Sequence, residues 1–224
     1  MPSESRLPST FARAFRVAAL LLGALVRFAA HSQNLQVTLQ DQHGAPVPDA
    51  VVSLSPTDGA AVPSATDQVH EIVQQGQAFI PYVTAVPVGS TVVFPNRDRV
   101  QHHVYSLSPA KKFELPLYDP GRSERIVFDR AGIVTLGCNI HDWMLAYLVV
   151  LPTPWFDRSD QTGHAALTAP AGAYRLTIWQ PRLSRPLEQD VTLTAAPTAL
   201  ALTLKLRPDR RLRRAPDSAG GAYD

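Results

Sequence analysis

The sequence predicts an all-β protein. Short runs rich in Val, Thr and Leu alternate apolar and polar residues with a period of two, the pattern of strands with one buried face. Turn-forming residues interrupt these runs often, since the 224 residues include 20 prolines and 12 glycines. Beyond the N-terminal segment, no stretch carries a convincing helical pattern. Short strands with turn signals every ~8–12 residues are typical of a β-sandwich or a β-barrel.

Strands are expected in three groups along the chain. The first group has alternating runs at 34–40 and 51–56 and ends at a small, polar stretch, 57–65. The second group is denser, with strands expected at 70–75, 78–89 (bent at Pro81), 90–96, 102–108, on both sides of a "DRAG" hairpin within 124–138, and at 145–152. The intervening "FELPLYDPGRS" is expected to be mostly loop. The third group lies within 160–206 and ends in two period-two strands.

The first 30 residues predict export. Arg6, Arg13 and Arg16 precede the apolar run "VAALLLGALV", and small residues follow it. A basic start, a short apolar run and a small-residue exit are typical of a secretory signal peptide. The run is too short for a membrane span of ~20 apolar residues. We therefore expect cleavage near Ala30, a periplasmic mature chain and no transmembrane span; an N-terminal amphipathic helix or a membrane anchor is the alternative.

The charge distribution argues against nucleic acid as a partner. The full chain has a net charge of +2, but residues 31–204 hold 11 basic and 15 acidic side chains, a net of −4. Nucleic-acid binding requires a basic face, and the positive charge is concentrated instead in the tail segment "KLRPDRRLRR". We expect residues 207–224 to form a basic, solvated and disordered tail.

One short segment combines three metal-binding residue types. "GCNIHDWM" holds Cys138, the single cysteine of the chain, followed by His141 and Met144 at spacings of three. A single cysteine cannot form an internal disulfide, so an exported thiol is either buried or occupied by a ligand. Upstream, "QHHVYS" places His102 at the head of an expected strand. Two imidazoles and a thiolate with a weak thioether are the ligands of a blue-copper electron-transfer site.

Residues 67–153 resemble the cupredoxins, especially the amicyanin, plastocyanin and pseudoazurin group. The Cys-x2-His-x2-Met loop of that family matches Cys138, His141 and Met144, and its upstream histidine matches His102. The resemblance implies a Greek-key β-sandwich with one copper ion held by these four side chains. The segments "FPN", "HHVYS", "FELPLY" and "GCNIHDWM" are also similar to those of bacterial methylamine utilization proteins.

Three neighbours of the expected ligands bear on the match. The family has an Asn six residues before the upstream histidine that hydrogen-bonds near the copper thiolate, and Asn96 stands at that offset. His103 and Asp142 depart from the family, which usually has Asn and often Pro there. Adjacent strand residues point to opposite faces, so the alignment selects His102 and leaves His103 as a surface residue. Asp142 is expected to be solvated.

The remaining chemistry-bearing side chains have plainer interpretations. Without the preceding Cys and His, Met144 would be a core gap-filler, and Trp143 is expected to be packed or half-exposed. The other histidines lie outside the motif and are expected at the surface: His31, His43, His70 and His164.

Two separated segments, 34–58 and 157–206, resemble the two halves of a carboxypeptidase regulatory-like β-domain. The resemblance implies a second small β-sandwich, interrupted by the cupredoxin domain at 67–153. Insertion at an exposed turn is tolerated when the termini of the inserted domain lie close together. A cupredoxin with extra edge strands is the alternative.

The cupredoxin resemblance implies a periplasmic carrier of single electrons rather than an enzyme. Electrons would leave through the ring edge of His141, as they do through the second loop histidine of that family. The expected partner is a redox protein that docks transiently over less than ~1,200 Å², and the chain is expected to be a monomer. Two alternatives stay open: a copper storage or delivery protein with the same ligands, and a structural or ligand-binding β-module that holds no metal.

Overall fold

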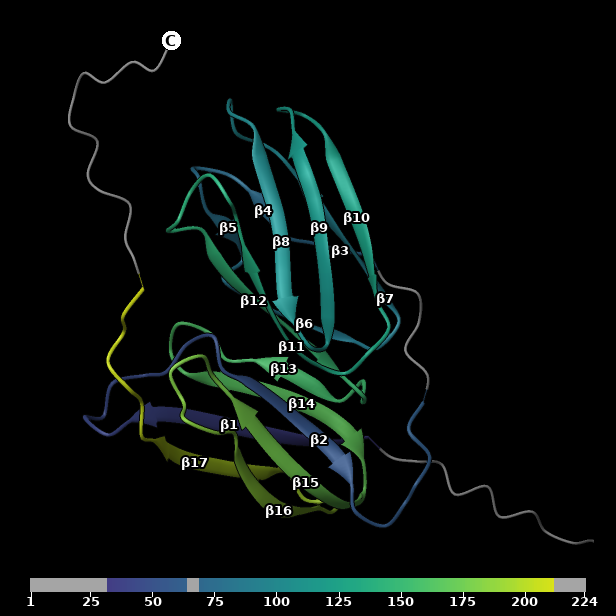
Figure 1. Ribbon diagram of the computed structural model, residues 1–224. Coiled ribbons are helices and arrows are strands. Elements are labelled where there is room, and N and C mark those ends of the chain that lie inside the picture. Colours follow the sequence, from purple (N-terminus) through teal and green to yellow (C-terminus); the bar gives the residue numbers. More distant parts are fainter. Residues whose placement is uncertain (1–31, 64–68, 212–224) are drawn as a thin grey trace, which may run out of the picture.

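The structure, a computed structural model, describes residues 32–63 and 69–211, and it confirms the all-β prediction. Figure 1 shows two stacked β-sandwiches. We call the one that contains residues 69–151 the site-bearing sandwich and the other the flanking sandwich. The predicted signal peptide lies outside the described residues. Within the described part, no helix is long and apolar enough to cross a membrane.

The flanking sandwich is built from the two ends of the described chain. Its three-stranded sheet has the order β14 (His164–Pro170), β1 (Ser32–Asp41), β17 (Thr198–Leu204). Its four-stranded sheet has the order β13 (Phe156–Arg158), β2 (Val51–Pro56), β15 (Gly172–Trp179), β16 (Leu187–Leu193). Alternate residues such as Leu35, Val37 and Leu176 are fully buried between the sheets, which explains the period-two pattern of the sequence.

The site-bearing sandwich also has two principal sheets. One has the order β10 (Ser123–Phe128), β7 (Ser90–Pro95), β3 (Val69–Glu71). The other has the order β6 (Val83–Pro87), β12 (Leu145–Leu151), β11 (Gly132–Gly137), β8 (His102–Ser108), β9 (Lys111–Tyr118). A short hairpin joins β4 (Val73–Gln74) to β5 (Phe79–Ile80). The core of the site-bearing sandwich includes Phe94, Phe128 and Leu136, together with Cys138 and Met144.

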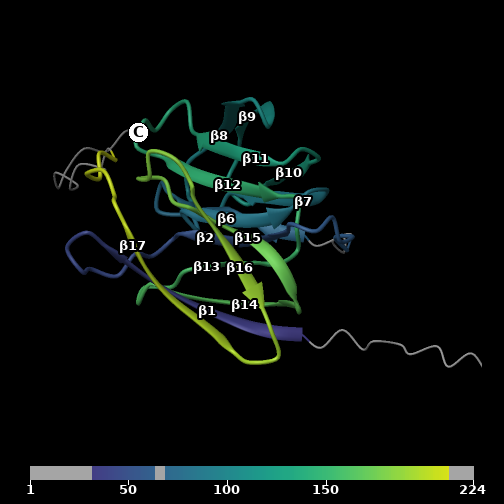
Figure 2. The same cartoon turned by 90° about the horizontal axis from the view of Figure 1, so that it is seen from below.

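A third apolar cluster joins the two sandwiches. Val51 of β2 packs with Val83 of β6 and with Val149 and Leu151 of β12. Aromatic side chains extend this contact, with the ring of Tyr147 5.4 Å from that of Trp179. Figure 2 shows β6 and β12 lying next to β2 and β15 in the view from below. The site-bearing sandwich is therefore anchored by apolar burial as well as by its chain connections.

Two expectations for the second strand group are wrong. The "DRAG" segment is not a hairpin turn, because β10 pairs with β7 while β11 pairs with β12 and β8 in the other sheet. Alternation alone cannot distinguish a hairpin from a crossing between sheets. "FELPLY" is a strand, part of β9, and not a loop. Pro116 is tolerated there because β9 is the last strand of its sheet and needs no donor on its outer side.

The start of the basic tail also differs from expectation. Residues 207–211 are described and contact the rest of the molecule, whereas 212–224 lie outside the described residues. The Arg207 side chain donates to the backbone carbonyls of Arg182 and Leu183. The Arg211 guanidinium lies 4.4 Å from the centre of the Tyr82 ring. These cation–carbonyl and cation–π contacts hold this short segment, which the charge pattern alone assigns to solvent.

Candidate metal centre

The candidate site lies where two strands of the five-stranded sheet begin or end. Cys138 directly follows β11, and Met144 directly precedes β12. Gly137 pairs with Leu145 at the last position of that ladder, so residues 138–144 form the loop that closes it. His102 is the first residue of β8. Figure 1 shows β8 running toward the flanking sandwich, which puts His102 at the far end of the site-bearing sandwich.

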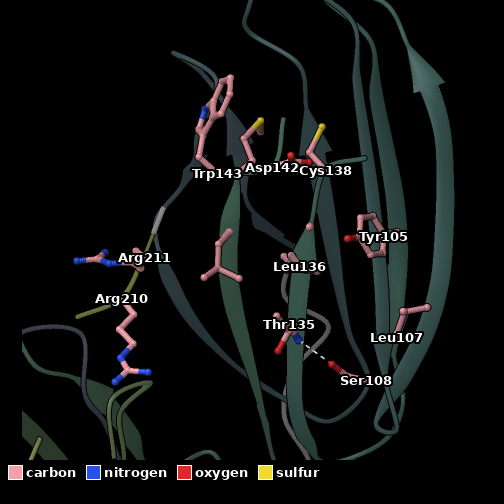
Figure 3. Close-up of a pocket in the computed structure, with 13 residues that line it drawn as sticks. Tyr105, Leu107, Ser108, Thr135, Leu136, Cys138, Asp142, Trp143, Arg210 and Arg211 are labelled. Atoms are coloured by element: carbon pink, nitrogen blue, oxygen red, sulfur yellow. Dashed lines mark hydrogen bonds between the residues drawn. The ribbon is translucent and has the colours of Figure 1, made fainter. Parts of the chain in front are cut away.

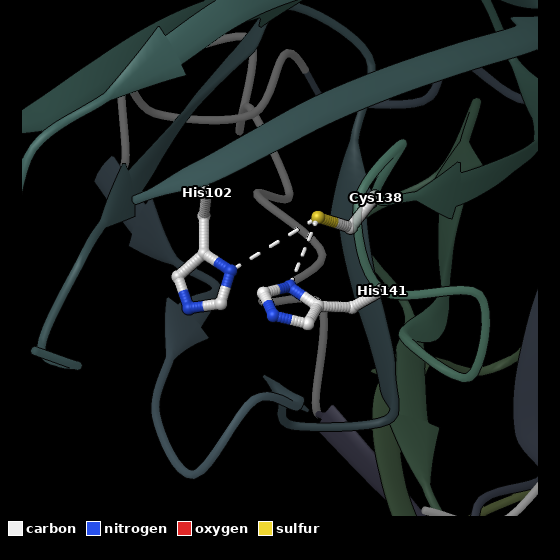
Figure 4. A group of neighbouring side chains, drawn as sticks. All are labelled: His102, Cys138 and His141. Carbon is white, nitrogen blue, oxygen red and sulfur yellow. Dashed lines mark hydrogen bonds between the residues drawn. The ribbon is translucent and has the colours of Figure 1, made fainter. Parts of the chain in front are cut away.

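Three of the four predicted ligands come together. The donor atoms of His102, Cys138 and His141 all lie within 4.8 Å of one another. The Cys138 Sγ is 4.0 Å from His102 Nδ1 and 3.6 Å from His141 Nδ1, and Figure 4 shows both rings turned toward the sulfur. His102 is fully buried, Cys138 is 4% exposed and His141 is half-buried.

The donor set fits a single metal ion. A metal ion bonded to a thiolate sulfur at ~2.3 Å and to an imidazole nitrogen at ~2.0 Å holds these two donor atoms roughly 3.5–3.7 Å apart. The His141 Nδ1–Sγ distance of 3.6 Å falls in that range, and the His102 Nδ1–Sγ distance of 4.0 Å is slightly longer. One thiolate with two imidazoles suits copper. His102 Nδ1 faces the sulfur because its Nε2 is engaged by Asp98 Oδ2 at 2.7 Å.

The electrostatics favour an ionised sulfur. Burial raises the pKa of the Cys138 thiol, but the His102 imidazole and the backbone N–H groups of His103 and Ile140 outweigh it, so the pKa lies below its usual value. Burial lowers the pKa of His102, and its contacts with Cys138 and Asp98 raise it above the usual value. The contact between the two side chains therefore lowers the pKa of the thiol and raises that of the imidazole. A metal ion binds a deprotonated sulfur and neutral imidazoles, so metal binding releases any proton that these donor atoms carry.

Met144 and Asn96 occupy supporting positions. Met144 is 3% exposed, shares the core cluster of Cys138, and its backbone N–H donates to the carbonyl of His141 at 2.9 Å. Both its predicted roles, core packing and axial ligation, are compatible with this placement. Asn96 is 1% exposed; its Nδ2 donates to the carbonyls of Val100 and Tyr118, and its Oδ1 accepts the N–H of Asp98. Asn96 therefore shapes the loop that carries Asp98.

The expectation that His103 is a surface residue is wrong. It is 6% exposed, and its Nε2 lies 3.0 Å from Glu114 of β9. The adjacent edge strand covers this face of β8, which the sequence did not reveal because that segment was expected to be loop. His43 and His164 are exposed as predicted, His70 is only partly exposed, and His31 lies outside the described residues.

Sequence reasoning missed Asp98. Its carboxylate accepts the N–H groups of Gly76 and Gln77 as well as binding His102. Burial raises the pKa of this carboxyl, but the Gln77 N–H and the His102 imidazole lower it more, so its pKa lies below the usual value. An Asp four residues before the expected ligand histidine was a visible signal, but a short acidic side chain in a loop is ordinary on its own.

An open cleft of about 530 Å³ borders the site. It lies over the outer face of the five-stranded sheet, with Cys138 and Trp143 at one end and Tyr105 and Leu107 along one side. Arg210 and Arg211 line its opposite side (Figure 3). The C-terminal end of the described chain therefore lines the same cleft as the loop that carries the candidate ligands.

No protein-family model matches this chain, and no curated protein matches it. Solved structures are similar to part of it. A purple cupredoxin from Nitrosopumilus maritimus is 24% identical, with a TM-score of 0.34, over 37% of this chain and 99% of that one. A Cu(I) structure of an amicyanin mutant is 19% identical, with a TM-score of 0.36, over 46% of this chain and 99% of that one.

A copper-containing nitrite reductase from Thermus scotoductus SA-01 is 26% identical, with a TM-score of 0.36, over 42% of this chain and 24% of that chain. Each likeness covers less than half of this chain. The described residues form an all-β molecule of two sandwiches.

Proposed function

We propose that this protein binds one copper ion at His102, Cys138, His141 and Met144 and carries single electrons between redox partners. The observation that carries the proposal is the convergence of a sulfur and two imidazole nitrogens within 4.8 Å. Copper supplies the chemistry by changing between Cu(I) and Cu(II). The protein supplies a buried thiolate and two oriented imidazoles whose strand and loop attachments resist rearrangement, which suits a site that must serve both oxidation states.

The proposed exit for electrons is His141. It is the half-buried member of the set, whereas His102 is fully buried. Ile140 beside it is 48% exposed, which gives the loop an apolar surface. Such a surface suits a transient redox partner with a small interface. We propose an electron carrier rather than an enzyme, because no bond needs to be made or broken at this site.

The location, the protein group and the domain organisation are proposed from the sequence patterns. We propose that the chain is exported by residues 1–30, acts in the periplasm as a monomer, and belongs with the methylamine utilization-like copper proteins. We further propose that segments 34–58 and 157–206 form one carboxypeptidase regulatory-like domain into which 67–153 is inserted. The pairing of β1 and β2 with strands that follow residue 155 supports this. N-terminal sequencing of protein from a periplasmic fraction tests the export step.

The test of the copper site is the visible spectrum of protein loaded with Cu(II). An intense thiolate-to-copper absorption band is expected for the natural chain, together with a reversible one-electron wave in voltammetry. Cys138→Ser should abolish the band because the thiolate is its source. Trp155→Phe, in the flanking sandwich, is the control and should leave it unchanged. A colourless Cu(II) form of the natural chain would sink the assignment, and Cu(I) binding without reversible redox would favour storage or delivery instead.

A further inference from the structure

A two-residue turn lies beside the candidate site and contacts both segments that carry the candidate ligands. Gly76 and Gln77, which we call the 76–77 turn, form the tip of the hairpin between β4 and β5. The N–H of Gln75 donates to the carbonyl of Ala78 at 3.0 Å, which closes the turn. Both tip residues have positive φ, 63° for Gly76 and 53° for Gln77, as in a tight type I′ hairpin turn.

The first contact runs to His102 through Asp98. The carboxylate of Asp98 accepts the N–H of Gly76 at 2.6 Å and the N–H of Gln77 at 2.8 Å. The same carboxylate binds His102 Nε2 at 2.7 Å. The Asp98 side chain is only 13% exposed and that of His102 is fully buried. Hydrogen bonds to an ionised carboxylate are shorter and stronger than neutral ones, so this route holds the His102 ring in place relative to the turn.

The second contact runs to the loop 138–144 through Trp143. The indole Nε1–H of Trp143 donates to the backbone carbonyl of Gln77 at 3.1 Å. The Trp143 ring lies 5.4 Å from that of His141, and the next residue, Met144, is bonded through its backbone N–H to the carbonyl of His141. Gln77 is therefore bonded to both segments: its carbonyl accepts from Trp143 of the loop, and its N–H donates to Asp98.

We propose that the 76–77 turn is a clamp that holds His102 and the loop 138–144 in register, with Asp98 and Trp143 as positioning residues. Within the described residues, the other connections between the two ligand-bearing segments include the candidate site itself, the Gly137–Tyr105 pair of the β8–β11 ladder, the bond from the Thr135 N–H to the Ser108 hydroxyl, and shared core packing. The clamp keeps the donor atoms together before any metal arrives. The effect of the clamp on copper binding rests on the proposed function, whereas the clamp itself rests only on the contacts described above.

Amide hydrogen exchange of the metal-free protein tests the clamp, with Asp98→Ala, Trp143→Phe and the double variant. Asp98→Ala should accelerate exchange of the Gly76 and Gln77 amides, and also of the Met144 amide across the turn. The expected acceleration is about fivefold, because one typical hydrogen bond changes a local opening equilibrium by that factor. The double variant should show less than the product of the two single effects, because both act through one turn. Trp155→Phe removes an indole N–H in the flanking sandwich and should change none of these rates.

Acceleration at Gly76 and Gln77 with an unchanged Met144 amide would overturn the clamp, since Asp98 would then act only locally. If Asp98→Ala does not fold, Trp143→Phe decides alone: faster exchange at Gly76 and Gln77 supports the clamp and unchanged rates refute it. In Cu(II)-loaded protein, either variant should alter the electron paramagnetic resonance spectrum, whereas Trp155→Phe should not. A natural chain without a thiolate–copper band would refute the proposed function, while the metal-free exchange rates still decide the clamp.

Discussion

The role of Cys138 is decided by side chains that come from elsewhere in the chain. A buried thiol without partners is inert, because burial raises its pKa. Here the His102 imidazole, 36 positions upstream, together with the backbone N–H groups of His103 and Ile140, outweighs that burial and holds the pKa below its usual value. His102 is in turn oriented by Asp98. The lowered pKa of this thiol thus follows from its neighbours, His102 among them, rather than from the cysteine itself.

His70 provides a pH-dependence at the same scale. Burial lowers its pKa, and its Nε2 is buried without a hydrogen-bond partner. The folded state therefore disfavours the imidazolium that the unfolded chain forms below pH ~6.5. This contribution to stability is present at neutral pH and is lost as the pH falls through that value.

We expect the metal-free protein to lose less stability between pH 7.5 and 5 when His70 is replaced by Gln, which cannot titrate. Urea denaturation of both proteins at the two pH values measures this difference. His43→Gln, at an exposed position, is the control and should behave like the natural chain. An equal loss of stability in the His70→Gln variant would show that the partly buried imidazole of His70 does not titrate as argued.

At the scale of the elements, glycines decide where strands can approach one another. Gly163 lies just before β14 with φ +80°, and a Cβ there would be 2.3 Å from the backbone oxygen of Leu39 in β1. Its own carbonyl accepts the N–H of Leu39 at 2.8 Å. The backbone of β1 therefore occupies the space of a side chain at position 163.

Gly163→Ala should destabilise the protein by roughly 2–5 kcal/mol, the sum of a left-handed backbone cost and an overpacking cost. Gly44→Ala is the matched control, since Gly44 has the same φ of +80° but no atom within 4 Å of the added Cβ. It should lose only the backbone part, ~1–2 kcal/mol. Equilibrium denaturation measures both, and equal losses would show that the β1 contact relaxes freely.

At the scale of the whole molecule, the chain leaves one sandwich and returns to it. Residues 57–63 are exposed and form no strand, and they connect β2 to the site-bearing sandwich. β1 and β2 nevertheless pair with strands that come after residue 155. A break in this connection cuts the chain but removes no strand pairing.

Limited proteolysis should therefore cut first within 57–63 and leave a resistant fragment that begins directly after the cut. The nicked protein should elute as one species in gel filtration, because β1 and β2 remain paired with β14, β15 and β17. Mass spectrometry locates the cut, and elution in denaturant confirms that the pieces are separate. Early release of the N-terminal piece under native conditions, or cuts spread evenly through both sandwiches, would contradict the inserted-domain proposal.

The sequence by itself determined the all-β class, most strand positions and the segments that carry the candidate ligands, because alternation and the Cys-x2-His-x2-Met spacing are local patterns. Tertiary structure alone decided which strands pair: β10 and β11 separate into different sheets, and Pro116 is accommodated at an edge. It also decided that Asp98 and Trp143 meet at Gln77. These contacts join residues 21 to 66 positions apart, and no periodic pattern records them, since hydrogen-bond partners are chosen by the packed geometry of the whole sandwich.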